Sequence, residues 1–239
     1  MNAETRPQPG DRGRPLTATE PLRPWRPLTL SATAVLATAF ATLTAAVAAG
    51  SPDLLRIDNA TVLAANALAA AHADLGTAAT ALSDIGSPVA VDMVVGVLVL
   101  TLLWRRRVRA ALYVLLVRLV ELAIETVVKV LIDRPRPTVP VVITHASESS
   151  FPSGHAAGSA ALVVSVLVLL LPRVGRTTAS ALVTLGALTC LAIAASRVLL
   201  GVHYPTDAVA GLILGTLCAV AALPLLPAAG ESARPATHG

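Results

Sequence analysis

SRVLLGVHYPTD, residues 196–207, separates two long apolar runs of the chain, 177–195 and 205–227. It places an arginine, a histidine and a carboxylate at the ends of hydrophobic segments, where ionisable groups are costly and by default indicate a functional site. Asp207 follows His203 by four residues, about one helical turn, so its carboxylate can reach the imidazole. Arg197 carries a fork of donors that suits phosphate. Taken alone, the stretch fits equally well a set of structural groups that cap two helices.

The composition is that of a membrane protein. Of the 239 residues, 55% are hydrophobic and 13% are charged, whereas about a quarter of the residues of a soluble protein are charged. Apolar runs of about 20 residues recur, and each is long enough to cross a bilayer. The net charge of +4 does not indicate a nucleic-acid partner, because the arginines lie in short clusters between apolar runs. Cys190 and Cys218 fall inside apolar runs, so we expect them to be core residues.

We therefore predict an all-α, polytopic membrane protein with six transmembrane helices and both termini in the cytoplasm. The predicted spans are 28–49, 88–104, 110–132, 155–171, 177–195 and 205–227, which together form one membrane domain, 28–227. Arginines at 105, 106, 107 and 109 place the second connection on the cytoplasmic side, and Arg173 and Arg176 mark another cytoplasmic turn. The Pro- and Arg-rich residues 1–27 predict a disordered cytoplasmic tail, and 228–239 a second cytoplasmic tail.

Residues 50–87 differ from the apolar runs, because they carry four aspartates and one arginine. We predict an extracytoplasmic loop whose alanine-rich middle, Ala60–Ala81, forms an amphipathic helix near the membrane surface. The alternative is a seventh span, which would invert the orientation of everything that follows. His72 in this segment has no partner in view. His145, further along, matches no motif position and is expected to be a surface residue.

Three polar clusters fall on the same, extracytoplasmic side of the predicted topology. The first is Lys129 with Arg136-Pro137, the second is Pro-Ser-Gly-His at 152–155, and the third is the stretch 196–207. The pattern of apolar runs does not require these clusters to coincide. Their convergence at one membrane face is the main indication of an active site.

These clusters resemble the three-part signature of the type 2 phosphatidic acid phosphatase (PAP2) superfamily: Lys-x6-Arg-Pro, Pro-Ser-Gly-His and Ser-Arg-x5-His-x3-Asp, in that order. The motifs cover about 130–227, and the six-helix layout extends the resemblance from residue 28 onwards. A second Arg-Pro pair starts at Arg134, but the family's spacing from lysine selects Arg136. The resemblance implies a membrane lipid phosphatase whose His203 attacks phosphorus and becomes phosphohistidine, with Asp207 fixing its tautomer. His155 would protonate the leaving oxygen and then activate water.

The remaining motif residues suit the binding of phosphate. Lys129, Arg136 and Arg197 would neutralise its charge, and fixed electrostatic stabilisation is usually the largest catalytic term. Ser153 and Gly154 fall where a helix begins, so their backbone N–H groups can hold phosphate oxygens, and glycine allows a close approach. Three cations take the role that magnesium has in other phosphoryl transfers. We therefore expect no metal and no other cofactor.

Arg118, Glu121, Glu125 and Lys129 are spaced three, four and four residues apart, so they form one stripe on the third predicted span. Such charges face the protein interior or a cavity. In one interpretation Glu125 orients Lys129 and keeps it charged. In the other, which the length of the stripe favours, the stripe is an internal ladder of ion pairs that fixes helix packing. Gly211 and Gly215 form a Gly-x3-Gly pattern that fits packing within the chain or dimerisation.

The predicted function is hydrolysis of a lipid phosphate or diphosphate at the cell membrane. Undecaprenyl diphosphate, phosphatidic acid and phosphatidylglycerol phosphate all present the same chemical group, and an outward-facing site slightly favours a polyprenyl diphosphate. An amphiphilic substrate could reach the site sideways between helices. The alternatives are a phosphotransferase of the same superfamily and a non-catalytic lipid-phosphate transporter or scaffold. The sequence does not predict an oligomeric state.

Overall fold

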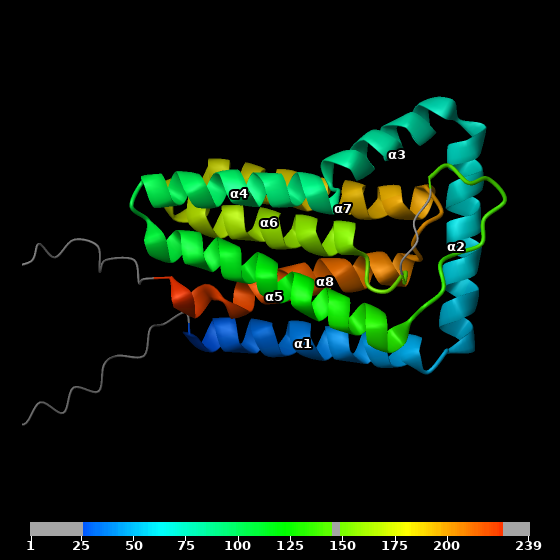
Figure 1. The fold of residues 1–239 in the computed structure, drawn as a ribbon, viewed down its shortest axis with the longest axis horizontal. Helices are drawn as coiled ribbons and strands as arrows, with labels where there is room; N and C mark the ends of the chain where they lie inside the picture. The colour runs from blue at the N-terminus through cyan, green and yellow to red at the C-terminus, as the bar shows by residue number, and fades with distance from the viewer. Residues whose placement is uncertain (1–25, 145–148, 227–239) are drawn as a thin grey trace, which may run out of the picture.

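The computed structural model describes residues 26–144 and 149–226, and all regular elements in these ranges are helical (Figure 1). The helices are α1 (Arg26–Ala48), α2 (Pro52–Ala71), α3 (Ala73–Ile85), α4 (Pro88–Trp104), α5 (Val108–Ile132), α6 (Gly154–Leu170), α7 (Arg176–Leu199) and α8 (Pro205–Ala221), with short 3-10 turns η1 (Leu171–Arg173) and η2 (Leu223–Leu225). The predicted tails lie almost entirely outside the described residues.

Most of the helices form one elongated bundle. Helices α1 and α4–α8 run along the long axis, α2 stands across one end of the bundle, and α3 slants back from α2 (Figure 1). The first helix begins and the last helix ends at the opposite end of the bundle from α2 (Figure 1). The predicted loop 133–154 matches the gap between α5 and α6, where four prolines prevent a continuous helix.

Four helical segments are long and apolar enough to cross a membrane: Leu28–Ala48, Gly154–Arg173, Arg176–Leu199 and Pro205–Leu225. Helices α3 and α4, bent by 41° at their junction, would count together as a fifth, broken span. The described residues thus hold four to five candidate spans where the apolar runs predict six. Helix α4 alone has only 17 residues, and α5 carries several charged side chains.

Helix α5 turns its charged stripe towards the bundle. Arg118, Glu121 and Glu125 are buried, as the sequence pattern predicts. The outer face of the same helix exposes apolar side chains, namely Leu119, Val120, Leu122, Val127, Val130 and Leu131. Helix α5 is therefore charged towards protein and apolar towards its surroundings, the arrangement expected of a charged helix in a bilayer.

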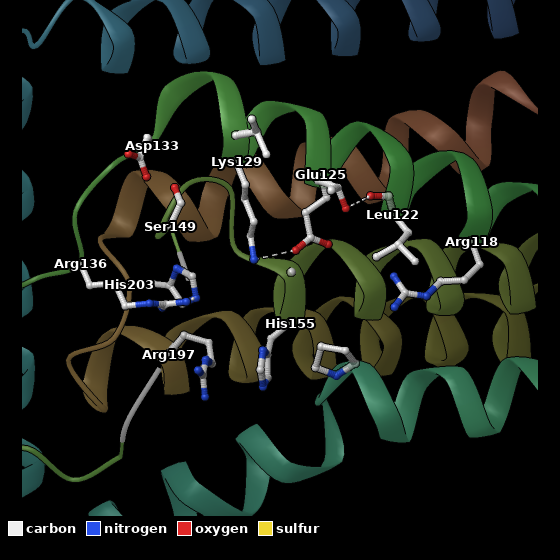
Figure 2. Close-up of a pocket in the computed structure, with 14 residues that line it drawn as sticks. Arg118, Leu122, Glu125, Lys129, Asp133, Arg136, Ser149, His155, Arg197 and His203 are labelled. Atoms are coloured by element: carbon white, nitrogen blue, oxygen red, sulfur yellow. Dashed lines mark hydrogen bonds and ion pairs between the residues drawn. The ribbon is translucent and has the colours of Figure 1, made fainter. Parts of the chain in front are cut away.

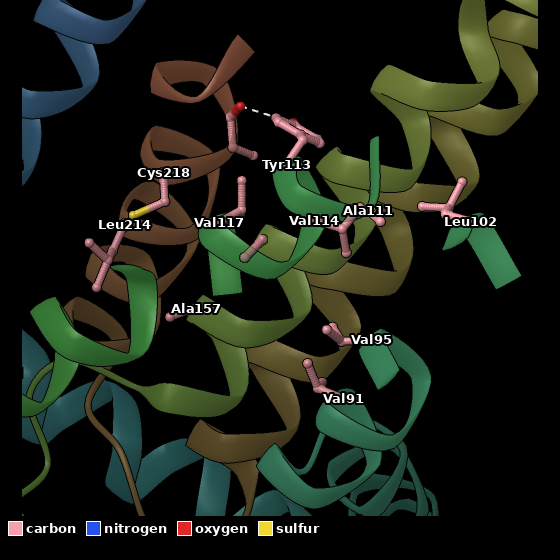
Figure 3. Packing of buried hydrophobic residues seen from close by; sticks show 12 residues of the cluster. Val91, Val95, Leu102, Ala111, Tyr113, Val114, Val117, Ala157, Leu214 and Cys218 are labelled. Atoms are coloured by element: carbon pink, nitrogen blue, oxygen red, sulfur yellow. Dashed lines mark hydrogen bonds between the residues drawn. The ribbon is translucent and has the colours of Figure 1, made fainter. Parts of the chain in front are cut away.

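The core is centred on the contact between α6 and α8. A Cβ added at Gly215 would overlap backbone atoms of α6, and one added at Gly211 would overlap the carbonyl oxygen of Ser153, which precedes α6, so the Gly-x3-Gly pattern serves packing within the chain. Figure 3 shows Leu214 and Cys218 of α8 near this contact, with side chains of α5 beside them. The Tyr113 hydroxyl of α5 donates to the Ala219 carbonyl oxygen at 2.9 Å. Both cysteines are buried, as predicted.

The predicted surface helix Ala60–Ala81 is wrong in its bounds, because the structure contains two helices there, α2 and α3. The chain breaks at His72, whose φ of −125° and ψ of 96° are extended. Each part keeps its own buried stripe. Helix α2 buries Asp58, Val62, Asn66 and Ala69, and α3 buries Gly76, Ala79 and Ser83. The Asn66 amide donates to the Val141 carbonyl oxygen at 3.1 Å, which ties α2 to the loop after α5.

Candidate active site

A cavity of about 690 Å³ lies between α5, the loop that follows it, the start of α6 and the end of α7. Figure 2 shows side chains from these segments gathered around it. Six of the eight residues predicted from the motifs line this cavity: Lys129, Arg136, Gly154, His155, Arg197 and His203. The other two, Ser153 and Asp207, are fully buried next to it. The structure therefore brings the three separate motifs together in one place.

His203 lies in the turn between α7 and α8, which Gly201 allows by adopting a φ of 72°. Its Nδ1 is 2.7 Å from the Ser150 carbonyl oxygen, and its Nε2 is 3.2 Å from Nη1 of Arg136. Since a carbonyl only accepts, Nδ1 carries the hydrogen and Nε2 carries the lone pair. Burial lowers the pKa of His203 to about 4, with Arg136 and Arg197 acting in the same direction and Asp207 against it. The imidazole is therefore neutral at pH 7, with Nε2 as the potential nucleophile.

Asp207 differs from the position that the resemblance implies. Its Oδ2 is 3.5 Å from Nδ1 of His203, further than the Ser150 carbonyl oxygen. Its oxygens instead accept from the Tyr204 backbone N–H at 2.9 Å and from Nη1 of Arg134 at 2.5 Å. In this geometry the Ser150 carbonyl fixes the tautomer of His203, and Asp207 acts on it as a nearby negative charge.

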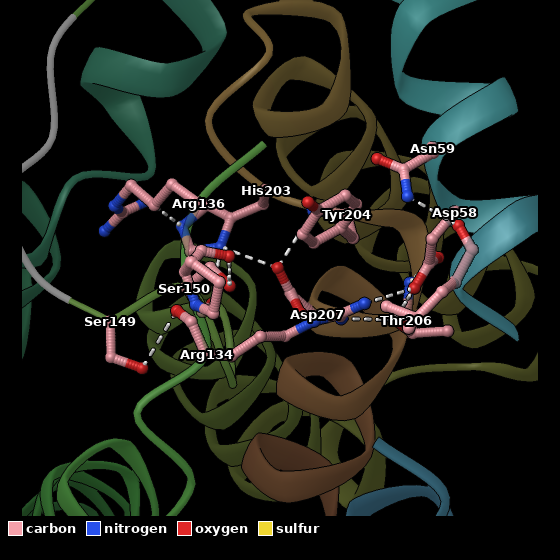
Figure 4. A network of polar contacts seen from close by, with 12 residues as sticks. Asp58, Asn59, Arg134, Arg136, Ser149, Ser150, His203, Tyr204, Thr206 and Asp207 are labelled. Atoms are coloured by element: carbon pink, nitrogen blue, oxygen red, sulfur yellow. Dashed lines mark hydrogen bonds and ion pairs between the residues drawn. The ribbon is translucent and has the colours of Figure 1, made fainter. Parts of the chain in front are cut away.

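Arg134, the arginine that the motif spacing rejects, belongs to a buried ionic network (Figure 4). It donates to Asp58 of α2 at 2.8 Å and to Asp207 at 2.5 Å, and its guanidinium lies 4.1 Å from the centre of the Tyr204 ring. The Thr206 hydroxyl also donates to Asp58, at 2.5 Å. Sequence reasoning missed Asp58, because nothing in its local pattern distinguishes it from the other aspartates of residues 50–87. Arg136, in contrast, lines the cavity.

The cations of the cavity are held by neighbouring helices. Nζ of Lys129 is 3.0 Å from Oε1 of Glu125, one turn earlier on α5. Arg197 donates through Nη1 to the hydroxyl of Ser83, so α3 holds this side chain. Nε of Arg197 is buried and has no hydrogen-bond partner among the described residues. A buried donor without a partner costs free energy, so this guanidinium is incompletely satisfied in the structure.

The start of α6 fits the prediction for Gly154 better than for Ser153. Gly154 is the first residue of α6 and lines the cavity. The Ser153 backbone N–H already donates to the Asp207 carbonyl oxygen at 3.0 Å, so it is not open to a phosphate oxygen. The Ser153 side chain is fully buried, and Oγ has no partner within the described part of the chain.

Two further histidines lie outside the site or outside the described residues. His72 is exposed at the junction of α2 and α3, and His145 falls in the gap between residues 144 and 149. In residues 26–144 and 149–226, no group of three His, Cys, Asp or Glu side chains is arranged to hold a metal ion.

The PAP2 superfamily matches residues 110–231, a range that contains all three motifs. The chain belongs to the PAP2 superfamily. Within this superfamily, the structure resembles the crystal structure of a transmembrane PAP2 type phosphatidylglycerolphosphate phosphatase from Bacillus subtilis, with a TM-score of 0.72 and 24% identity. That likeness covers 80% of this chain and 93% of the other, and it shows that the fold is shared.

Two curated relatives of this PAP2 chain are phosphatases. Decaprenylphosphoryl-5-phosphoribose phosphatase of Mycobacterium tuberculosis is 35% identical over 96 residues, which are 39% of this chain and 48% of the relative. Phosphatidylglycerophosphatase B of Bacillus subtilis is 34% identical over 115 residues, or 47% of this chain and 56% of the relative. The chain thus spans about half the length of the curated relatives that it matches.

Proposed function

We propose that this protein is a multi-pass membrane phosphatase that releases phosphate from a lipid phosphate or diphosphate. The observation that carries the proposal is the Nε2 lone pair of His203 beside a cavity that is also lined by four cationic side chains, those of Arg118, Lys129, Arg136 and Arg197. A neutral imidazole next to fixed positive charge is suited to attack a phosphate group, whose charge would otherwise repel a nucleophile. Two relatives named as phosphatases with lipid substrates support the same class of reaction.

The reaction proceeds in two steps. In the first, Nε2 of His203 forms a bond to phosphorus while the bond to the leaving oxygen breaks. His155 acts as the general acid and gives that oxygen a proton. In the second, His155 takes a proton from a water molecule, whose oxygen attacks phosphorus and breaks the P–N bond. Inorganic phosphate leaves, and both histidines return to their starting states.

The cations bind and stabilise the phosphate group in both steps. Lys129, Arg136 and Arg197 offset the charge on its oxygens without a metal ion. Asp207 keeps a negative charge near His203, which favours the imidazole ring once it carries the phosphoryl group. Gly154 opens α6 towards the cavity, and the N–H groups of a first helical turn have no partner within their own helix.

The substrate is proposed to be an amphiphile with a phosphate head. Helices α1 and α4–α8 form the membrane part as six spans, which put both termini in the cytoplasm. The site then faces the extracytoplasmic side, where arginine-rich connections are disfavoured. The substrate reaches the site from within the bilayer. Polyprenyl-linked phosphates and phosphatidylglycerol phosphate are the two classes that the relatives' names indicate.

The decisive experiment uses the purified full-length protein in detergent with a chelator present. Phosphate release is measured from a panel of polyprenyl diphosphate, polyprenyl phosphate, phosphatidic acid and phosphatidylglycerol phosphate. The wild type should release phosphate from at least one, His203→Ala should lose at least 1,000-fold in rate (on the order expected for loss of a nucleophile), and His72→Ala should stay unchanged. An active His203→Ala variant would refute the phosphohistidine. Binding without release would indicate a transporter or scaffold, and transfer to a second lipid a phosphotransferase.

A further inference from the structure

The carboxylate of Glu125 lies inside the candidate phosphate site. It lines the cavity together with Lys129 and Gly154. Figure 2 shows its carboxylate next to the ammonium of Lys129 and directed towards the start of α6. Its Oε1 is 3.0 Å from Nζ of Lys129. A Cβ added at Gly154 would overlap the same carboxylate, so Glu125 is packed directly on the first residue of α6.

Glu125 therefore occupies the surroundings that suit a phosphate oxygen. It has a lysine ammonium on one side and the start of a helix on the other, and both favour negative charge. Four cationic side chains line the cavity, and without an anion they would repel one another. Glu125 supplies an anion next to Lys129 in the absence of substrate, and Asp133 is a second carboxylate in the lining. Its side chain is 9% exposed, so water screens the charge only weakly.

We propose that Glu125 is an internal counter-ion of the phosphate site, which binds Lys129 when the site is empty and yields it when a phosphate group arrives. The inference rests on the proposed function, because it assigns the same cavity to phosphate. Glu125 is then a positioning residue with two opposite effects. Its charge stabilises the empty site, and it lowers the affinity of the site for every phosphate group, including the inorganic phosphate that is the product. The ion-pair ladder favoured from the spacing alone then applies to Arg118 and Glu121, which pair one turn further along.

The test is the affinity for inorganic phosphate, which needs no turnover. Calorimetric titration of the full chain should show that Glu125→Gln binds phosphate about 10-fold more tightly, the order expected when one repelling charge is removed at close range. Glu125→Ala should behave in the same way, and it keeps the test available if the Gln variant does not fold. Glu125→Asp keeps the charge and should stay within about 3-fold of the wild type.

Glu121→Gln is the matched control, because it makes the same change one turn away at a buried residue that does not line the cavity. It should leave phosphate affinity within about 2-fold of the wild type. Weaker phosphate binding by Glu125→Gln would overturn the inference, since it would mean that Glu125 only orients Lys129. Equal tightening by Glu121→Gln, or by Glu125→Asp, would overturn it as well, since the effect would not depend on the charge at this place.

Turnover gives a second, separate readout. In Glu125→Gln the KM for the lipid phosphate and the inhibition constant of inorganic phosphate should fall together, because a charge that opposes bound phosphate throughout acts on uniform binding. A fall in kcat without a fall in KM would contradict this. If no lipid phosphate is hydrolysed but Glu125→Gln still tightens phosphate binding, the proposed function fails and the counter-ion stands. If the wild type hydrolyses a lipid phosphate but Glu125→Gln binds phosphate no more tightly, the proposed function stands and the counter-ion role fails.

Discussion

At the scale of single residues, His203 is defined by the groups that surround its ring. The Ser150 carbonyl oxygen takes the hydrogen on Nδ1, and Arg136 donates towards Nε2, so each nitrogen has one role. Burial keeps the ring neutral. A nucleophile that is already deprotonated needs no separate base, which leaves His155 available for the leaving oxygen and for water.

The lowered pKa of His203 predicts a pH dependence of stability. Between its ordinary value of 6.5 and about 4, the unfolded chain binds a proton on this residue that the folded chain does not. The corresponding stability is present in full above pH 6.5 and is lost as the pH falls towards 4. The side-chain amide of His203→Asn can still donate to the Ser150 carbonyl. In this variant the free energy of unfolding should fall less steeply below pH 6.5, by the contribution of up to one bound proton.

The measurement is the thermal unfolding midpoint in detergent between pH 4 and 8, compared for wild type, His203→Asn and the exposed-site variant His72→Asn. The His72 variant should keep the wild-type slope. An unchanged slope in His203→Asn would show that the folded protein takes up this proton as readily as the unfolded chain.

At the scale of elements, α2 is more than a cover over the end of the bundle. Asp58 is buried and ties α2 to Arg134 after α5 and to Thr206 at the start of α8. Through Arg134 this contact reaches Asp207 and so the surroundings of His203. Helix α3 makes a similar contact by holding Arg197 through Ser83. Two helices outside the family match thus position residues of the third motif, Arg197 and Asp207.

Asp58→Asn should therefore destabilise the protein by about 3 kcal/mol, because it leaves buried Arg134 with one fewer compensating charge. Asp53→Asn is the control on the same helix, since Asp53 forms an exposed pair with Arg56 and should change stability by less than about 1 kcal/mol. Chemical or thermal unfolding in detergent measures both. Equal effects of the two substitutions would mean that the Asp58–Arg134 pair adds nothing beyond a surface pair.

At the scale of the whole molecule, the site lies near the end of the bundle that α2 covers, and the arginine-rich turn between α4 and α5 lies at the other end (Figure 1). This arrangement predicts that the two ends face opposite sides of the membrane. Val142→Cys, exposed in the loop after α5, should react with a membrane-impermeant maleimide in intact cells. Arg107→Cys should react only after permeabilisation, because positive charge favours the cytoplasmic side.

The native cysteines are buried, so the background labelling should be low, and a variant without an added cysteine provides the control. Labelling of Val142→Cys and Arg107→Cys from the same side of the membrane would contradict the proposed topology, and with it the extracytoplasmic location of the site. The experiment also bears on the number of spans, since an odd number of crossings between residues 107 and 142 is required for the expected pattern.

The sequence predicted much of this architecture, because apolar runs and prolines act locally. The bounds of α4 and the gap between α5 and α6 match the predicted ranges, and six of the eight motif residues line one cavity. The break at His72 was not predictable in the same way. It depends on two helices finding different buried stripes, and an alanine-rich segment carries no local signal for a stop.

The sequence by itself determined a helical membrane protein and which residues of three short motifs would meet, because hydrophobic length and residue type are properties of the chain alone. Only the tertiary structure decided that the Ser150 carbonyl lies closer to His203 than Asp207 does, that Ser83 holds Arg197, and that the Glu125 carboxylate rests on Gly154. Such contacts join segments far apart, as with Asp58 and Thr206 at a separation of 148 residues. Their geometry is set by how whole helices pack, which no local pattern encodes.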